Sequence, residues 1–439
     1  MAMATAKGQR LDLDAAARLV RSRDTLACGF VAGQPAGFLE AFGARTDLED
    51  VVLHTGLLLR PYALLQNPAV RVVSGFFGPI ERTARAAGGR VAYQPADFSG
   101  LERLGLRLRP RVVLAVTTAP DAGGWLSFGA HAGATYRTFL DAARDPERLA
   151  IAEVNPRMPR VDGLPHLGGN RVHVSEVDVV VEHDEALVTI PEDPTSPEDL
   201  AIAQLVVERI HPEAILQFGI GAVPDEIARR LAAGSAGGFG IHTEMVSDGV
   251  MHLHEAGKVA NRKPLYPGHT VATFALGSER LYRWLDGNPE VRMLPVSDVN
   301  DAWVLRQLPR LTSINAALAV DLAGQVAADS IGARQYSGAG GHESFVSGAG
   351  LAPEGRSFLC LASTATVGGK RISTIVPSFP EGTRVTTPRH HVQHVVTEHG
   401  AVDLSVLSDV ERPAALIELA HPDFRDELRA TLRRTGGTT

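Results

Sequence analysis

Short apolar runs alternate with helically spaced apolar residues along most of the chain. Residues 111–117 contain a continuous apolar run, Val112 to Val116, which is typical of a strand covered on both faces. Such runs predict strands at residues 25–31, 51–54, 70–74, 90–93, 111–117, 149–155, 214–218, 271–274, 292–296, 316–320, 357–361 and 394–397. Helical spacing predicts helices at residues 11–24, 37–44, 80–87, 200–210, 225–232, 412–420 and 424–434. Strands that alternate with helices indicate an α/β fold with mainly parallel pairing.

Residues 188–199 interrupt this alternation because they are rich in proline and acid. That composition is typical of an interdomain linker, after which Ser196 and Pro197 can begin a helix. We therefore predict two α/β domains, residues 1–189 and residues 190–439. The strand–helix rhythm is similar in the two halves, so we expect two similar domains with a cleft between them.

Composition limits the class of protein. A chain of 439 residues is too long for one ordinary core, and 44% hydrophobic with 21% charged residues predicts globular folding. The formal net charge is −7 and no basic stripe carries interleaved aromatics, so we expect no nucleic-acid partner. Two distant cysteines, Cys28 and Cys360, fit a reducing compartment. Without a signal-peptide pattern or an apolar run of about 20 residues, we expect a cytoplasmic protein with no membrane partner.

The stretch 240–249 reads Gly-Ile-His-Thr-Glu-Met-Val-Ser-Asp-Gly and places one carboxylate, Glu244, among apolar residues. A glutamate in such surroundings either folds behind a partner or faces a cleft. A carboxylate that is shielded from water and lacks a strong partner is a better nucleophile than a solvated one. The alternative is a surface turn that carries an ordinary glutamate.

Two glycine-rich stretches are candidates for ligand contact. Gly219-Ile-Gly-Ala-Val-Pro lies between a predicted strand and a predicted helix, where backbone amides can approach an anion closely. Pro224 stands where a dinucleotide fingerprint needs its third glycine, so we expect another kind of ligand loop or a tight packing turn. In the second stretch, Gly338, Gly340 and Gly341 could donate amides to an oxyanion, or form a flexible loop.

Several other polar residues each allow a structural and a functional interpretation. Asn315, Asp321 and Gln325 lie on or near an apolar run and are ordinarily satisfied structural groups, although Asn315 could orient a carboxylate. Glu398, at a strand end, could contact the first acid or cap the next turn. The histidines lack the spacing of metal ligands, so no metal site is predicted, and no Gly-x-Ser-x-Gly elbow is present.

Together the motifs resemble the acetyl-CoA hydrolase/transferase family, class I CoA-transferases that include 4-hydroxybutyrate, butyrate and acetate CoA-transferases. The matching stretches, in chain order, are residues 118–129, 154–160, 174–178, 219–224, 240–249, 314–325, 337–341, 375–377 and 396–400. They cover nearly the whole chain. The resemblance implies two open, mainly parallel α/β domains with the active site between them.

The resemblance also assigns roles to residues. Glu244 matches the family's nucleophile, and Gly341 matches the glycine whose amide faces the thioester oxygen. Asn315 and Glu398 match polar residues around the glutamate. The stretches that match CoA-contacting positions are Gly219, Ile220, Gly221, Ala222 and Val223, with Gly340 and Gly341.

The implied reaction transfers CoA from an acyl-CoA to a small carboxylic acid through a covalent glutamyl-CoA thioester. Because the thioester energy is conserved, neither a metal nor a permanently bound cofactor is expected. A homodimer or homotetramer is the usual assembly of such a soluble enzyme.

The chain departs from the family pattern at Ser344 and Ser347, where the family commonly has an aspartate and an arginine. Two charges are therefore missing near the expected site. This departure keeps two alternatives open: an acyl-CoA hydrolase, in which water replaces the acceptor acid, and a CoA-binding module without turnover.

Overall fold

The computed structural model describes residues 7–191 and 194–434. The chain divides into two compact units: unit 1 is residues 1–191 with 271–299, and unit 2 is residues 192–270 with 300–439. The chain first passes from unit 1 to unit 2 inside the predicted linker. Residues 271–299 then belong to unit 1, which differs from the predicted division into 1–189 and 190–439.

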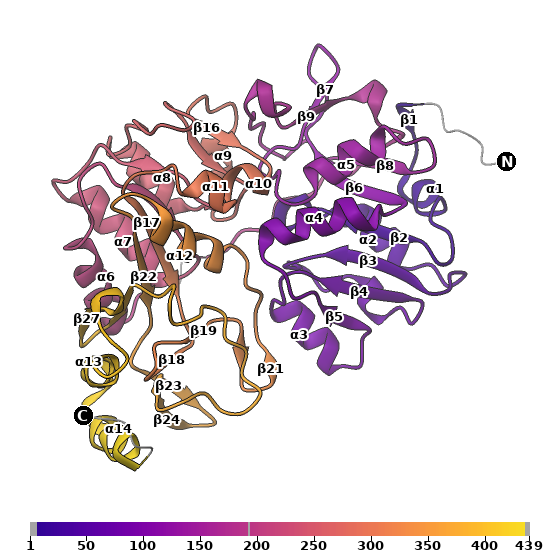
Figure 1. Ribbon diagram of the computed structural model, residues 1–439. Helices are drawn as coiled ribbons and strands as arrows, with labels where there is room; N and C mark the ends of the chain where they lie inside the picture. The colour runs from indigo at the N-terminus through magenta and orange to yellow at the C-terminus, as the bar shows by residue number, and fades with distance from the viewer. Residues whose placement is uncertain (1–6, 192–193, 435–439) are drawn as a thin grey trace. The chain divides into compact units, whose positions relative to one another are not determined.

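Within the described part of unit 1, an eight-stranded sheet has the order β1-β10-β8-β6-β2-β3-β4-β5 (Figure 1). Every neighbouring pair in it is parallel. Its strands are β1 (Gln9–Arg10), β2 (Thr25–Cys28), β3 (Val51–Thr55), β4 (Val70–Ser74), β5 (Val91–Tyr93), β6 (Val112–Thr117), β8 (Leu149–Val154) and β10 (Val179–Glu182). All six residues of β6 are buried, as its apolar run predicts.

Helices and short strands complete unit 1. Helix α5 packs on β6 and β8, and α4 packs on α5 (Figure 1). The helices are α1 (Leu13–Ala17), α2 (Ala36–Gly43), α3 (Pro79–Ala86), α4 (Phe98–Leu108), α5 (Tyr136–Ala143), α9 (Glu279–Leu285) and α10 (Val296–Val299). The short strands are β7 (Trp125–Ser127), β9 (Arg171–His173), β15 (Phe274–Ala275) and β16 (Val291–Met293); β14 (Thr270–Ala272) begins at the last residue before the chain returns to unit 1.

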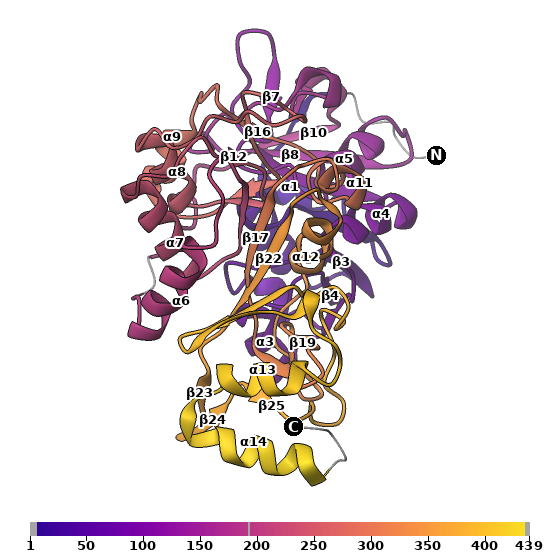
Figure 2. The same ribbon diagram turned by 60° about the vertical axis from the view of Figure 1, so that its left-hand side comes forward.

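In the part of unit 2 that the structure describes, a six-stranded sheet has the order β12-β11-β17-β22-β26-β27. The pairs are parallel except for the β26–β27 hairpin. Its strands are β11 (Ile215–Phe218), β12 (Gly240–Ile241), β17 (Leu311–Ala316), β22 (Arg356–Cys360), β26 (His394–Thr397) and β27 (Gly400–Asp403). Helix α12 packs on β17 and β22, with α6 and α7 on the opposite side (Figure 2).

The remaining elements of unit 2 lie around this sheet. The helices are α6 (Pro197–Val207), α7 (Ala222–Ala233), α8 (Asp248–Glu255), α11 (Ala302–Leu305), α12 (His342–Leu351), α13 (Arg412–Leu419) and α14 (Pro422–Arg434). The short strands are β13 (Met245–Val246), β18 (Ala319–Asp321), β19 (Val326–Ala327), β20 (Ser330–Ile331), β21 (Arg334–Gln335), β23 (Thr364–Val367), β24 (Lys370–Ser373) and β25 (Ile375–Val376).

The α/β class with mainly parallel sheets is confirmed, while several element bounds differ from prediction. Ser196 caps α6 by accepting from the Asp199 amide, and Pro197 is the first helical residue, as the sequence indicates. The predicted helix 11–24 is only Leu13–Ala17. The strand Leu311–Ala316 was missed because its Thr, Ser and Asn side chains interrupt the apolar pattern.

Both cysteines are buried and free. Burial raises the pKa of the Cys28 thiol and of the Cys360 thiol to about 12, because an apolar environment disfavours the thiolate. None of the helices in residues 7–191 and 194–434 combines the length and apolar character needed to cross a bilayer.

Candidate active site

Glu244 occupies a bend between β12 and β13 in unit 2. Its neighbours His242, Thr243 and Val246 are fully buried, whereas Glu244 itself is half-buried. The strand that leads to it is fixed on β11, because the amide of His242 donates to the Leu216 carbonyl at 3.1 Å. The backbone next to Glu244 is thus fixed on β11, while the Glu244 residue remains partly exposed.

Asn300 contacts the Glu244 carboxylate directly. Its Nδ2 donates to Glu244 Oε2 at 2.6 Å, a short hydrogen bond of the kind that a charged acceptor makes. Asn300 is 1% exposed, so this hydrogen bond lies under the carboxylate and fixes its orientation. Asn300 carries no signal in the sequence, because nothing in Ser297-Asp-Val-Asn distinguishes it from an ordinary helix end.

Gly341 lies against the same carboxylate oxygen that Asn300 bonds. A Cβ built on Gly341 would lie 2.2 Å from Glu244 Oε2 and 2.6 Å from Asn300 Nδ2. Real Cβ atoms do not approach so closely, so no other residue fits at position 341 with the carboxylate in this place. Glu244, Asn300 and Gly341 are separated widely in sequence and form one constellation within unit 2.

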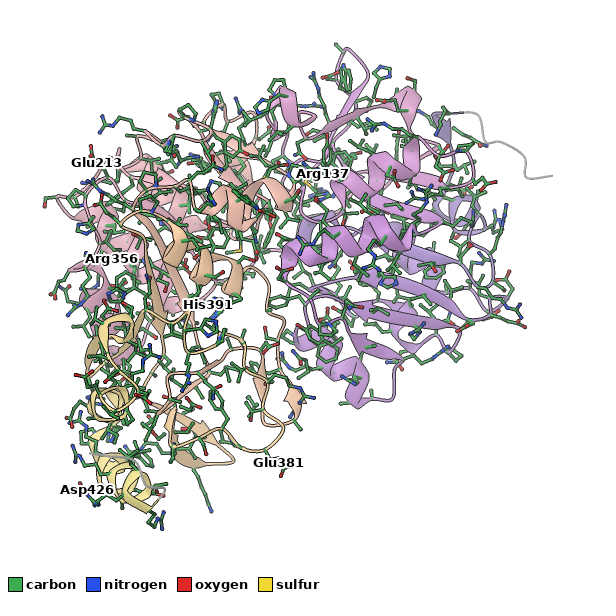
Figure 3. All side chains as sticks on the ribbon, viewed as in Figure 1. Arg137, Glu213, Arg356, Glu381, His391 and Asp426 are labelled. Atoms are coloured by element: carbon green, nitrogen blue, oxygen red, sulfur yellow. The ribbon has the colours of Figure 1, made fainter. Side chains whose placement is uncertain are left out.

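Helix α12 begins immediately after Gly341, which is its N-cap. The dipole of this ten-residue helix places partial positive charge at its N-terminus, next to the Glu244 carboxylate. In the first turn, Glu343 Oε1 lies 2.5 Å from His391 Nδ1, a contact that ties this turn to residue 391 (Figure 3). The arrangement favours negative charge at Glu244 and on an oxyanion formed beside it.

The glycine loop 219–221 lies beside the segment that carries Glu244. The Thr243 hydroxyl exchanges hydrogen bonds of 3.3 Å with the amide and the carbonyl of Phe218. Beyond Phe218, Ile220 is 48% exposed and Gly221 has φ of 129°, a conformation that favours glycine. Ala222 and Val223 form the start of α7. The predicted CoA-contacting residues are therefore an accessible loop next to the segment of Glu244.

Asn315 lies beneath this loop rather than in hydrogen-bond contact with Glu244. Its Nδ2 donates to Gln217 Oε1 at 3.0 Å and to Ser313 Oγ at 2.8 Å, and all three side chains are buried. A Cβ on Gly219 would lie 3.1 Å from Asn315 Oδ1, so the amide side chain supports the close turn at Gly219. Gln217 and Ser313 were not singled out from the sequence, because a polar residue within a strand gives no signal of its partner.

Glu398 follows β26 and accepts from the Ser363 amide at 2.9 Å and from the Ser363 hydroxyl. His399 Nε2 lies 3.4 Å from Glu398 Oε1. Among residues 7–191 and 194–434, its hydrogen bonds thus go to Ser363 and not to Glu244. The Glu398 side chain therefore bonds the bend at Ser363, which is neither a contact with Glu244 nor a cap of the next turn, the two expectations from the sequence.

Among the described residues, no group of three or more His, Cys, Asp or Glu side chains is arranged to hold a metal ion. The chemistry that this constellation can perform is carried by one oriented carboxylate. Backbone amides and a helix N-terminus lie beside it.

Comparison with known proteins identifies the family. Residues 277–432 match the model of the acetyl-CoA hydrolase/transferase C-terminal domain. The succinyl-CoA:cyclohexane-1-carboxylate CoA transferase of Geobacter metallireducens is 36% identical, with 95% of this chain and 94% of that protein covered. The 4-hydroxybutyrate coenzyme A transferase of Clostridium kluyveri is 38% identical, with 77% of each covered.

The crystal structure of RipA from Yersinia pestis is similar over almost its full length. The TM-score is 0.88 and the identity 32%, with 98% of each chain covered. The chain therefore belongs to the acetyl-CoA hydrolase/transferase family. The enzyme class predicted from the sequence, CoA-transferase, is confirmed at the level of that family.

Proposed function

We propose that this protein is an acyl-CoA:carboxylate CoA-transferase in which Glu244 is the nucleophile. The observation that supports this most directly is the Glu244 carboxylate, which accepts a hydrogen bond from Asn300 and lies against the backbone of Gly341. The similarity to enzymes named as CoA-transferases supports the same reaction class. The substrates are an acyl-CoA and a small carboxylic acid.

The chemistry proceeds in two exchanges. A Glu244 carboxylate oxygen attacks the thioester carbonyl, and the carbon–sulfur bond breaks. CoA departs as the thiolate, and an acyl-glutamyl anhydride remains on the enzyme. The thiolate then attacks the glutamyl carbonyl, which releases the donor's carboxylate and leaves a glutamyl-CoA thioester. An incoming carboxylate reverses both steps and leaves with CoA. No net proton or electron is exchanged.

The residues around Glu244 serve this sequence in distinct ways. Asn300 orients the attacking oxygen, and the Gly341 amide stabilises each tetrahedral oxyanion together with the N-terminus of α12. Residues 219–223 hold the CoA chain, whose binding energy positions the thioester. Asn315 supports that loop through Gly219. Glu398 fixes the bend at Ser363 by accepting hydrogen bonds from the Ser363 amide and hydroxyl.

The experiment that tests the proposal is mass spectrometry after incubation with acyl-CoAs. Because the relatives' names contain succinyl-CoA and 4-hydroxybutyrate, the panel includes succinyl-CoA, 4-hydroxybutyryl-CoA and acetyl-CoA. We expect a CoA-sized mass increase that peptide mapping locates on Glu244 and that a carboxylate acceptor removes. Transfer without any adduct on Glu244 would disprove the covalent mechanism.

Acyl-CoA hydrolysis is the second candidate, favoured by the serines at positions 344 and 347 of α12, where the family commonly has charged residues. Ser347 Oγ donates to the Glu343 carbonyl at 2.7 Å, so at this position the helix presents a hydroxyl that is already engaged. With fewer charges to bind an acceptor acid, water has easier access to the anhydride. Steady CoA release without any carboxylate, at a rate equal to that with one, would identify a hydrolase.

Replacing Asn300 by alanine is expected to lower kcat about 10–100-fold, since a hydrogen bond to a charged group contributes about 1.5–3 kcal/mol. The measurement is steady-state transfer at saturating substrates. Asn288→Ala is the matched control, because Asn288 donates to the Trp284 carbonyl in unit 1 and does not touch Glu244. Equal activity of the two variants would remove Asn300 from the mechanism.

A further inference from the structure

The loop 338–341 consists of Gly-Ala-Gly-Gly, a composition with little intrinsic rigidity. Gly340 has φ of 51°, and Gly341 touches the Glu244 carboxylate. A backbone amide stabilises an oxyanion only where it is held within about 0.5 Å of its productive place. The loop itself cannot supply that precision, so its flanks must.

The upstream flank is held by Asp329, which is 8% exposed. Its backbone carbonyl accepts from the amides of Tyr336 and Ser337 at 2.9 and 3.0 Å. Gln335 Nε2 donates to the same carbonyl at 3.1 Å, to Asp329 Oδ2 at 3.1 Å and to the Ser337 carbonyl at 2.8 Å. Asp329 is in turn fixed by Thr386, whose hydroxyl donates to Asp329 Oδ1 at 2.7 Å.

The downstream flank of the loop is held by Thr387, the residue that follows Thr386. His342 Nε2, directly after Gly341, lies 3.0 Å from the hydroxyl of Thr387, which is fully buried. Burial lowers the pKa of His342 to about 4, so the imidazole is neutral and the contact is unchanged around neutral pH. The amides of Thr386 and Thr387 both donate to the Val326 carbonyl on β19, at 2.8 and 3.2 Å.

We propose that the consecutive residues Thr386 and Thr387 form a double anchor that positions the loop 338–341 for catalysis, with Asp329 and His342 as the positioning residues that transmit it. This inference rests on the proposed function of Gly341 as an oxyanion donor. In physical terms, one backbone segment, residues 386–387, fixes both ends of the four-residue loop. Hydrogen bonds from its amides to the Val326 carbonyl hold that segment on β19.

The test compares Thr387→Val, Asp329→Asn and Thr387→Ser in the full-length protein. We expect Thr387→Val and Asp329→Asn to lower kcat about 10–100-fold, somewhat less than the loss of a whole oxyanion donor. The dissociation constant for CoA, measured by calorimetry, should change much less than kcat, because five of the seven positions matched to CoA contact, residues 219–223, are untouched. Thr387→Ser keeps the hydroxyl and should restore kcat to within about threefold.

Ser330→Ala is the matched control. Ser330 is 2% exposed and follows Asp329, and its hydroxyl bonds only the backbone of Arg384, at 2.9 and 3.3 Å. It therefore loses comparable hydrogen bonds in the same region without releasing the loop. If kcat of Thr387→Val and Asp329→Asn falls no more than that of Ser330→Ala, the double anchor is wrong.

If the more buried variants do not fold, Gln335→Ala supplies the test, because Gln335 is only half-buried and its replacement should disturb folding less. A roughly tenfold lower kcat with unchanged CoA affinity would support the anchor, and an unchanged kcat would overturn it. If these variants lose kcat while a Glu244→Ala variant keeps full activity, the double anchor stands and the covalent mechanism is disproved. The two failures are thus distinguishable.

Discussion

Replacing Glu244 by alanine is expected to reduce CoA transfer by at least roughly 10⁴-fold, since without the carboxylate neither the anhydride nor the thioester can form. The site otherwise remains intact, because the neighbours of Glu244 are held by backbone hydrogen bonds to β11. CoA affinity should therefore change little. The measurement is transfer between an acyl-CoA and a carboxylate, together with calorimetric CoA binding.

Glu213→Gln is the matched control for this prediction. Glu213 is an exposed glutamate of unit 2 that pairs with Arg262 at 3.1 Å (Figure 3). Its replacement should leave the rate within about twofold, because exposed ion pairs contribute little. Transfer activity of Glu244→Ala close to that of Glu213→Gln would show that another group is the nucleophile.

Gly341→Ala is expected to reduce kcat about 10²–10³-fold while the protein still folds. The added methyl group would lie 2.2 Å from Glu244 Oε2, so the carboxylate or the loop must move. Either movement separates the proposed nucleophile, Glu244, from the Gly341 amide that we propose stabilises the oxyanion. Circular dichroism and thermal unfolding report the fold, and single-turnover formation of the Glu244 adduct reports the chemical step.

Gly350→Ala is the corresponding control on the same helix. A Cβ there meets nothing nearer than Gln393 Nε2 at 4.0 Å, and alanine favours the helix. We therefore expect normal activity and equal or slightly higher stability. A Gly341→Ala variant as active as Gly350→Ala would contradict the close contact with Glu244.

The sequence was sufficient to predict elements whose apolar residues are consecutive or capped. Strand β6 is an uninterrupted buried run, and α6 starts with Ser196 and Pro197, so both carried strong local signals. Helix α1 is shorter than its apolar spacing suggested. Strand β17 was missed, because its buried Thr312, Ser313 and Asn315 interrupt the apolar pattern. Ser313 and Asn315 bond Gln217 on β11, whereas Thr312 bonds the nearby Arg310 carbonyl.

The same limit applies to the candidate site. Glu244 and Gly341 stand in recognisable motifs, and the structure brings them into contact. Asn300, which bonds the carboxylate, stands in no motif, whereas Asn315 matched one and bonds Gln217 and Ser313. Two asparagines are equivalent in a sequence, and only the folded chain decides which of them reaches the Glu244 carboxylate.

The buried cysteines have a practical consequence for measuring this enzyme. With pKa values of about 12, only about one in ten thousand of the Cys28 and Cys360 thiols would be ionised at pH 8, and neither reaches the surface. The protein has no other cysteine. A disulfide reagent that reports thiols by colour would therefore count liberated coenzyme alone, even at enzyme concentrations high enough to follow a single round of reaction.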